Sequence, residues 1–188
     1  MFSHPTRITR SPIVTMAAIA LLAACTPTAS PEPTGSGPTG PVVSSPGQGL
    51  GSLPGVEGFT YRAEDGAVPG FVAGANESLD GAAEVSIVQS AIATRGSDQV
   101  SLIAFGFPGS TDTVAVDYFA RVLDGMEDGF GAGSQPVFDG DAYVMTNNGQ
   151  SVVLAPWGRT AEHLVFLFAL GPSGITEQLA AAILGVEG

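Results

Sequence analysis

Alternating and continuous apolar runs divide the C-terminal part of the chain into short strands and two helices. The runs are rich in β-branched and aromatic residues, and Gly or Asn turn signals separate them. Strands are predicted at Phe59 to Arg62, Val85 to Thr94, Val100 to Phe107, Ala142 to Thr146, Ser151 to Ala155 and His163 to Leu170. The turns Gly96-Ser97-Asp98 and Asn147-Asn148-Gly149 predict two antiparallel hairpins.

Two segments change from strand spacing to helical spacing. Asp112 to Met126 follows Pro108 and places polar residues on one side and Phe119, Leu123 and Met126 on another. A second helix is predicted to start at Pro172 and Ser173, with its buried side at Ile175, Leu179 and Ile183. The Gly-rich stretch that ends at Gly81 is predicted to be irregular, and so is the acidic stretch between the first helix and the later strands.

The order strands, helix, strands, helix predicts an α+β domain, an antiparallel sheet of about five or six strands with two helices packed against it. A displacement of 64 residues lays Arg95 on Arg159 and Pro108 on Pro172. This suggests a duplicated strand-strand-helix unit as a hypothesis. The element order also resembles the PsbP-like sandwich of some actinobacterial envelope lipoproteins, a likeness in fold that assigns no residue a role.

The N-terminus has the layout of an export signal. Arg7 and Arg10 precede an apolar run from Ile13 to Ala24, which is shorter than the ~20 residues that span a bilayer. The run ends in Leu22-Ala23-Ala24-Cys25, which resembles the lipobox of bacterial lipoproteins. That resemblance implies cleavage before Cys25 and a diacylglyceryl group on its sulfur, which would hold the protein at the extracytoplasmic face of the cell membrane. An ordinary secretory signal or a true anchor helix is the alternative.

The chain therefore divides into three parts, a signal peptide at 1–24, a lipidated Cys and tether at 25–54, and one globular domain at 55–188. From Thr26 to Pro54 the composition is dominated by Pro, Gly, Ser and Thr, which favours an extended tether. Its Ser and Thr residues are candidate sites for sugars.

The charge balance limits the partners. The chain has a net charge of −12, and removal of Arg7 and Arg10 with the signal leaves four arginines against 18 acidic residues, a net charge of −14. A nucleic-acid partner or an anionic lipid surface needs a basic face, so both are disfavoured for the domain. The membrane contact is expected through the lipid on Cys25 alone.

Residues with catalytic or metal-binding chemistry are scarce. His163 is the one His of the mature chain, no nucleophile-elbow motif is present, and Cys25 is the only Cys. No catalytic residue, cofactor or metal ligand is therefore assigned. Calcium binding by the acidic loop from Asp124 to Asp141 is left as an open alternative, because several carboxylates there surround flexible Gly residues. These acidic residues are Asp124, Glu127, Asp128, Asp139 and Asp141.

Two features favour binding. Trp157, the sole Trp, and Arg159 lie at a predicted hairpin tip and form a possible binding surface; the alternative is that Trp157 folds back over the sheet edge. Phe105 and Phe107 are predicted to share one sheet face, and Phe166 and Phe168 another. If the two helices cover only one face, the other is left for a loop, a dimer partner or an apolar ligand.

The expected function is that of a membrane-anchored cell-envelope lipoprotein with a non-catalytic binding or interaction domain, whose partner is an unknown envelope protein. The alternatives are a carrier of a lipid or other apolar ligand and, least favoured, a hydrolase.

Overall fold

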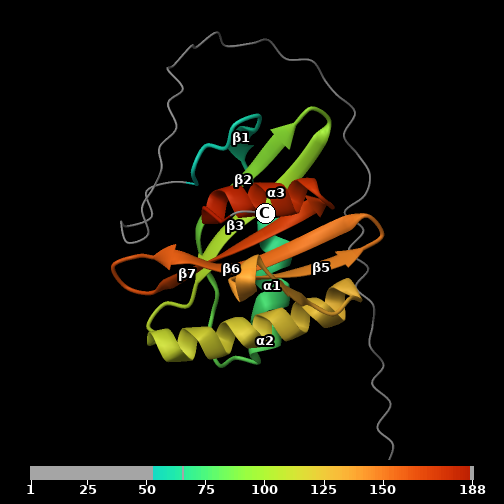
Figure 1. Cartoon of the computed structure of the whole chain (residues 1–188). Helices are drawn as coiled ribbons and strands as arrows, with labels where there is room; N and C mark the ends of the chain where they lie inside the picture. Colours follow the sequence, from blue (N-terminus) through green and yellow to red (C-terminus); the bar gives the residue numbers. More distant parts are fainter. Residues whose placement is uncertain (1–52, 65, 187–188) are drawn as a thin grey trace, which may run out of the picture. The chain divides into compact units, whose positions relative to one another are not determined.

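A computed structural model describes residues 53–64 and 66–186, which form an antiparallel sheet with helices on both faces (Figure 1). The α+β class is the one that the sequence predicted. The strands of these residues are β1 (Thr60–Ala63), β2 (Ser86–Arg95), β3 (Asp98–Gly106), β4 (Gln135–Val137), β5 (Ala142–Asn147), β6 (Gln150–Arg159) and β7 (Leu164–Pro172). The helices are α1 (Val68–Leu79), α2 (Asp112–Phe130) and α3 (Ile175–Leu184), with a 3₁₀ turn, η1 (Phe138–Gly140).

The sheet has the strand order β1-β2-β3-β7-β6-β5-β4. Both predicted hairpins are confirmed, since Arg95 pairs with Asp98 and Asn147 pairs with Gln150. In the second turn Asn148 and Gly149 have φ values of 50° and 75°, which suits the twist of a two-residue hairpin. The long-range contact between β3 and β7 joins the two hairpins at the centre of the sheet.

Successive side chains of β3 and β7 point to opposite faces and so enter two separate cores. One face carries an aromatic cluster under α1 and α2, built around Phe71, Phe105, Phe107, Phe119, Phe166 and Phe168. The other face carries an aliphatic cluster under α3, built around Val100, Leu102, Leu167, Leu179 and Ile183. Figure 1 shows α3 crossing the sheet on the face opposite α1.

Helix α1 lies where the sequence predicted an irregular stretch. Gly70 and Gly74 weaken the local helix signal, but Phe71, Ala75 and Leu79 recur every four residues and are the buried side of the helix. The Glu64 carboxylate accepts hydrogen bonds from the Gly66 and Ala67 N–H groups at 2.5 and 2.8 Å, which satisfies backbone donors at the helix start.

The folded part also begins earlier than expected. Leu53, which the sequence placed in the tether, is buried in the aliphatic cluster, and its N–H donates to Gln89 Oε1 at 2.8 Å. Helix α2 extends to Phe130, four residues past the predicted Met126, and ends at Gly131 in the left-handed conformation. The stretch predicted to be a loop after it contains β4 and η1.

The hypothesis of a duplicated unit is wrong. A displacement of 64 residues would lay β2-β3-α2 on β6-β7-α3, but α2 packs on the aromatic face and α3 on the aliphatic face. Since β3 and β7 are adjacent and antiparallel, the two units have opposite handedness and no rotation superposes them. Ile103 would be laid on Leu167, which points to the other face.

The predicted separation of the phenylalanine pairs is also wrong. Phe105 lies directly opposite Phe166 in the β3–β7 register, and Ile103 lies opposite Phe168, so all four phenylalanines share one face. The second face is covered by α3, together with Leu53 and Val56. No helix in the described part of the chain is both long and apolar enough to cross a membrane.

A candidate binding groove at the edge of strand β6

Strand β6 continues past the point where its outer neighbour begins. The register between β5 and β6 starts at the pair Tyr143 and Leu154, whereas β6 stays paired with β7 as far as Arg159. The pairing with β7 shifts between Pro156 and Gly158, so Trp157 is the extra residue of a β-bulge. This outer edge of β6 is where the candidate groove lies.

The predicted position of Trp157 at a hairpin tip is therefore wrong. Pro156 and Gly158 read as turn residues in the sequence, but in the sheet they mark the bulge, which is the place within a strand that tolerates Pro and Gly. The real tip of the hairpin lies between Arg159 and Leu164. Trp157 is half-buried and packs against the aliphatic cluster, which places it closer to the alternative that it folds over the sheet.

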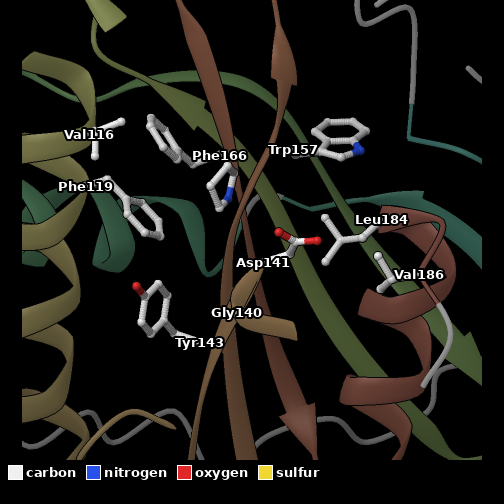
Figure 2. Close-up of a pocket in the computed structure, with 10 residues that line it drawn as sticks. Val116, Phe119, Gly140, Asp141, Tyr143, Trp157, Phe166, Leu184 and Val186 are labelled. Carbon is white, nitrogen blue, oxygen red and sulfur yellow. The ribbon is translucent and has the colours of Figure 1, made fainter. Parts of the chain in front are cut away.

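The groove has a volume of about 310 Å³ and runs across the sheet edge from α2 to the end of α3 (Figure 2). Its lining residues are Val116, Phe119, Gly140, Asp141, Tyr143, Pro156, Trp157, Phe166, Leu184 and Val186. Apart from Asp141, these residues are apolar, aromatic or Gly. Mostly apolar walls with few polar groups are typical of binding pockets.

One side of the groove is formed by α2 and the aromatic cluster. The Phe119 and Phe166 rings stack with centroids 4.6 Å apart at an interplanar angle of 13°, and this stacking holds both rings in place as one wall of the groove. Val116 lies one helical turn before Phe119 and is 51% exposed, a high value for a large apolar side chain. Figure 2 shows Val116, Phe119, Tyr143 and Phe166 together on this side.

The other side is formed by Trp157 and the C-terminal end of α3. Figure 2 shows the Asp141 carboxylate pointing toward Leu184, with Val186 beside it and the Trp157 indole nearby. Asp141 is the only acidic or basic residue among the lining residues. The groove thus combines an aromatic wall, an indole and one carboxylate.

A strained turn places Asp141 at the rim. Phe138, Asp139 and Gly140 have consecutive positive φ values of 54°, 56° and 94°. The left-handed conformation costs about 1–2 kcal/mol for a residue with a Cβ, so it persists only where packing enforces it. Phe138 supplies that packing through its contact with the aliphatic cluster.

Arg159 does not join Trp157 in one patch. Its Nη1 forms an ion pair with Asp112 Oδ2 at 2.6 Å, at the first residue of α2 and hence on the aromatic side of the sheet. The two side chains are 53% and 56% exposed, so water screens the pair and its contribution to stability is at most about 1 kcal/mol. Instead, Trp157 and Asp141 line the same groove. The sequence did not predict this, because the two residues are 16 positions apart in elements whose register was not known.

The acidic stretch from Asp124 to Asp141 is divided between elements. Asp124, Glu127 and Asp128 belong to α2, Asp139 lies in η1 and Asp141 follows it. Glu127 Oε1 accepts a hydrogen bond from the Ser134 N–H at 2.8 Å, and hydrogen bonding by Ser134 lowers the pKa of Glu127 below its ordinary value. Within residues 53–64 and 66–186, no three His, Cys, Asp or Glu side chains come close enough to share a metal ion.

His163 is buried immediately before β7, where its ring lies over Gly106. Its Nδ1 lies 3.5 Å from Thr160 Oγ1, and its Nε2 has no hydrogen-bond partner among the described residues.

A second cluster of polar side chains lies around the buried Ser151, whose hydroxyl donates a hydrogen bond to Glu177 Oε1 at 2.5 Å. Ser151 pairs with Gly171 at the far end of the β6–β7 hairpin from His163, so the structure does not assemble His163, Ser151 and Glu177 into one site.

The comparisons with known proteins give no family. No protein-family model matches the chain, and neither a curated protein nor a solved structure gives a significant match. The predicted lipidation site, Cys25, lies outside the described residues, as does the predicted tether up to residue 52. The likeness to PsbP-like lipoproteins therefore stays a prediction from element order.

Proposed function

We propose that this protein is a lipid-anchored cell-envelope lipoprotein whose domain binds another envelope protein through the β6 edge groove, without catalysis. The anchoring half rests on the order of Arg7 and Arg10, the apolar run, the small residues and Cys25. Two acyl chains on Cys25 would give stable attachment, where one chain alone is marginal.

The anchoring half is tested by labelling living cells with an alkyne-tagged palmitate. Wild-type protein is expected to incorporate the label and to sediment with membranes. The Cys25→Ser variant is expected to incorporate none. Equal labelling of both proteins would refute lipidation at Cys25.

The binding half rests on one observation, the half-buried Trp157 held by a bulge on one side of a groove whose other side carries an exposed apolar residue, Val116. Trp at the centre of an apolar surface is the residue type most enriched among those that dominate protein–protein binding energies. Beyond Leu154 the outer edge of β6 is not paired with β5, but Pro156 has no N–H to donate and the bulge interrupts the strand, so a partner there is expected to bind mainly through side-chain contacts.

The size of the groove favours a protein partner over the carrier alternative. Pockets for small molecules span about 300–1,000 Å³ and bury most of their ligand. A groove of about 310 Å³ is at the lower end of that range. The uncovered sheet face that the carrier alternative assumed is occupied by α3.

Photo-crosslinking in the host cell tests the binding half. A benzophenone amino acid replaces Val116 at the groove, and in a matched control it replaces Val88 of β2, the other exposed large apolar residue of the described structure. The expected result is one discrete crosslinked species from position 116 that disappears with Trp157→Ala and is absent from position 88. Equal crosslinking from both positions would refute a specific site at the groove.

A further inference from the structure

The chemistry of the groove specifies which kind of segment it accepts. Resting on the proposed function, we infer that the β6 edge groove recognises a basic side chain flanked by apolar side chains in an extended segment of the partner protein. The observation behind this is that one carboxylate, Asp141, lies among aromatic and aliphatic walls that contain no basic residue.

Aromatic rings and a carboxylate together favour a cation with an apolar stem. The face of a Trp or Tyr ring attracts a cation within about 6 Å of its centroid, and a guanidinium also forms strong hydrogen bonds to a carboxylate. The stem of an Arg or Lys side chain packs on apolar surface while its head reaches a polar group. Trp157, Leu184 and Asp141 provide this combination on one side of the groove (Figure 2).

The other side of the groove accounts for the apolar flanks. Val116, Phe119 and Tyr143 line it without a charged group. Side chains of an extended segment alternate in direction, so a segment that crosses the edge of β6 presents neighbouring residues to the two sides. An apolar residue next to a basic one therefore fits the two walls at once.

Charge argues against the chain itself as the occupant. Residues 26–52 contain no Arg or Lys, so the tether lacks the basic side chain. The four arginines of the described domain are engaged within it: Arg62 bonds Gln99, Arg95 bonds Gln178, Arg121 lies over the Tyr118 ring and Arg159 pairs with Asp112. A second copy would have to break one of these contacts. The net charge of −12 instead attracts a basic partner from solution.

The sole Trp makes the test direct, because any emission change reports on the groove itself. The full chain in non-ionic detergent is titrated with acetyl-Leu-Arg-Leu-Arg-Leu-amide. A twin peptide carries citrulline in place of each Arg, which keeps the shape and removes the charge. Trp157 emission and calorimetry are read in parallel, with empty micelles as the blank. The arginine peptide is expected to bind about five- to tenfold more tightly than its twin, the range for a partly desolvated cation near aromatic rings.

Variants then assign the preference to Asp141. Asp141→Asn is expected to reduce the preference to less than twofold, whereas Asp139→Asn keeps it, since Asp139 carries the same charge two residues away and does not line the groove. Equal affinity of the wild-type protein for both peptides would overturn the inference, because the groove would then bind a segment without selecting for a positive charge. An unchanged preference in Asp141→Asn would also overturn it. The absence of both an emission change and binding heat with either peptide would also overturn the inference. The crosslinking experiment at position 116 tests the proposed function independently.

Discussion

Helices α1 and α2 are in close contact at Gly125, and substituting this residue tests whether their packing positions the groove wall. A Cβ added at Gly125 would lie 1.9 Å from Ser78 Oγ and 2.8 Å from Ser78 Cβ. Rotation of the Ser78 side chain would move Oγ and break its hydrogen bond to the Gly74 carbonyl, but it would not move Cβ. The clash of Gly125→Ala therefore requires a backbone shift.

Two opposing terms set the size of the effect. Ala is better than Gly in a helix interior by about 1 kcal/mol, whereas inserting a methyl group into a tight contact costs about 1–3 kcal/mol. Gly125→Ala is therefore expected to lower the free energy of unfolding by about 1 kcal/mol. In a Ser78→Gly background the nearest remaining atom of residue 78 is its Cα at 3.8 Å, an ordinary contact. There the same substitution is expected to raise the free energy of unfolding by about 1 kcal/mol.

The reversal of sign is measured by urea unfolding of the four proteins of this double-mutant cycle, followed by circular dichroism. The expected coupling between the two positions is about 2 kcal/mol. Because Val116 and Phe119 lie on α2, Gly125→Ala is also expected to alter Trp157 emission, which Ser78→Gly restores. Additive effects within about 0.5 kcal/mol would refute the close approach of the two helices.

Three further predictions follow from buried or hydrogen-bonded groups. Phe166→Ala is expected to cost about 3–5 kcal/mol of unfolding free energy, because a fully buried ring at the base of the groove is lost; a thermal midpoint close to wild type would contradict this. Ser151→Ala is expected to cost about 1–3 kcal/mol by removing a donor to Glu177, and urea unfolding measures it. The hydrogen bonds to Glu127 lower its pKa in the folded protein. They therefore stabilise the fold at pH values above the ordinary pKa of Glu, and this stabilisation is lost as the pH falls through the pKa of Glu127 in the folded protein. Carbon NMR is expected to show a Glu127 midpoint below the ordinary Glu value that rises in Ser134→Ala, and an unchanged midpoint would contradict that cause.

Local patterns in the sequence determined the fold class, the principal strands and both hairpins. Alternation, turn residues and helical spacing are properties of a few neighbouring residues, so they are visible without the rest of the chain. The Asn148-Gly149 turn shows this, because only residues that tolerate positive φ fit there. Helix α1 was missed because its glycines lower the local propensity, and its stability comes from packing Phe71 on the Phe105 and Phe168 rings.

Long-range pairing decided everything that concerns the groove. The register of β3 against β7 placed four phenylalanines on one face, and the crossing of α3 over the other face filled the surface that sequence had left open. The Pro156 and Gly158 pattern is compatible with a turn or a bulge, and only the partner strand β7 selects the bulge. Register depends on contacts between residues far apart in sequence, so no local pattern could bring Asp141, Trp157 and Leu184 together. The sequence by itself determined the acidic character of the domain and is the sole basis of the predicted anchor at Cys25, because charge and residue order are visible without the fold.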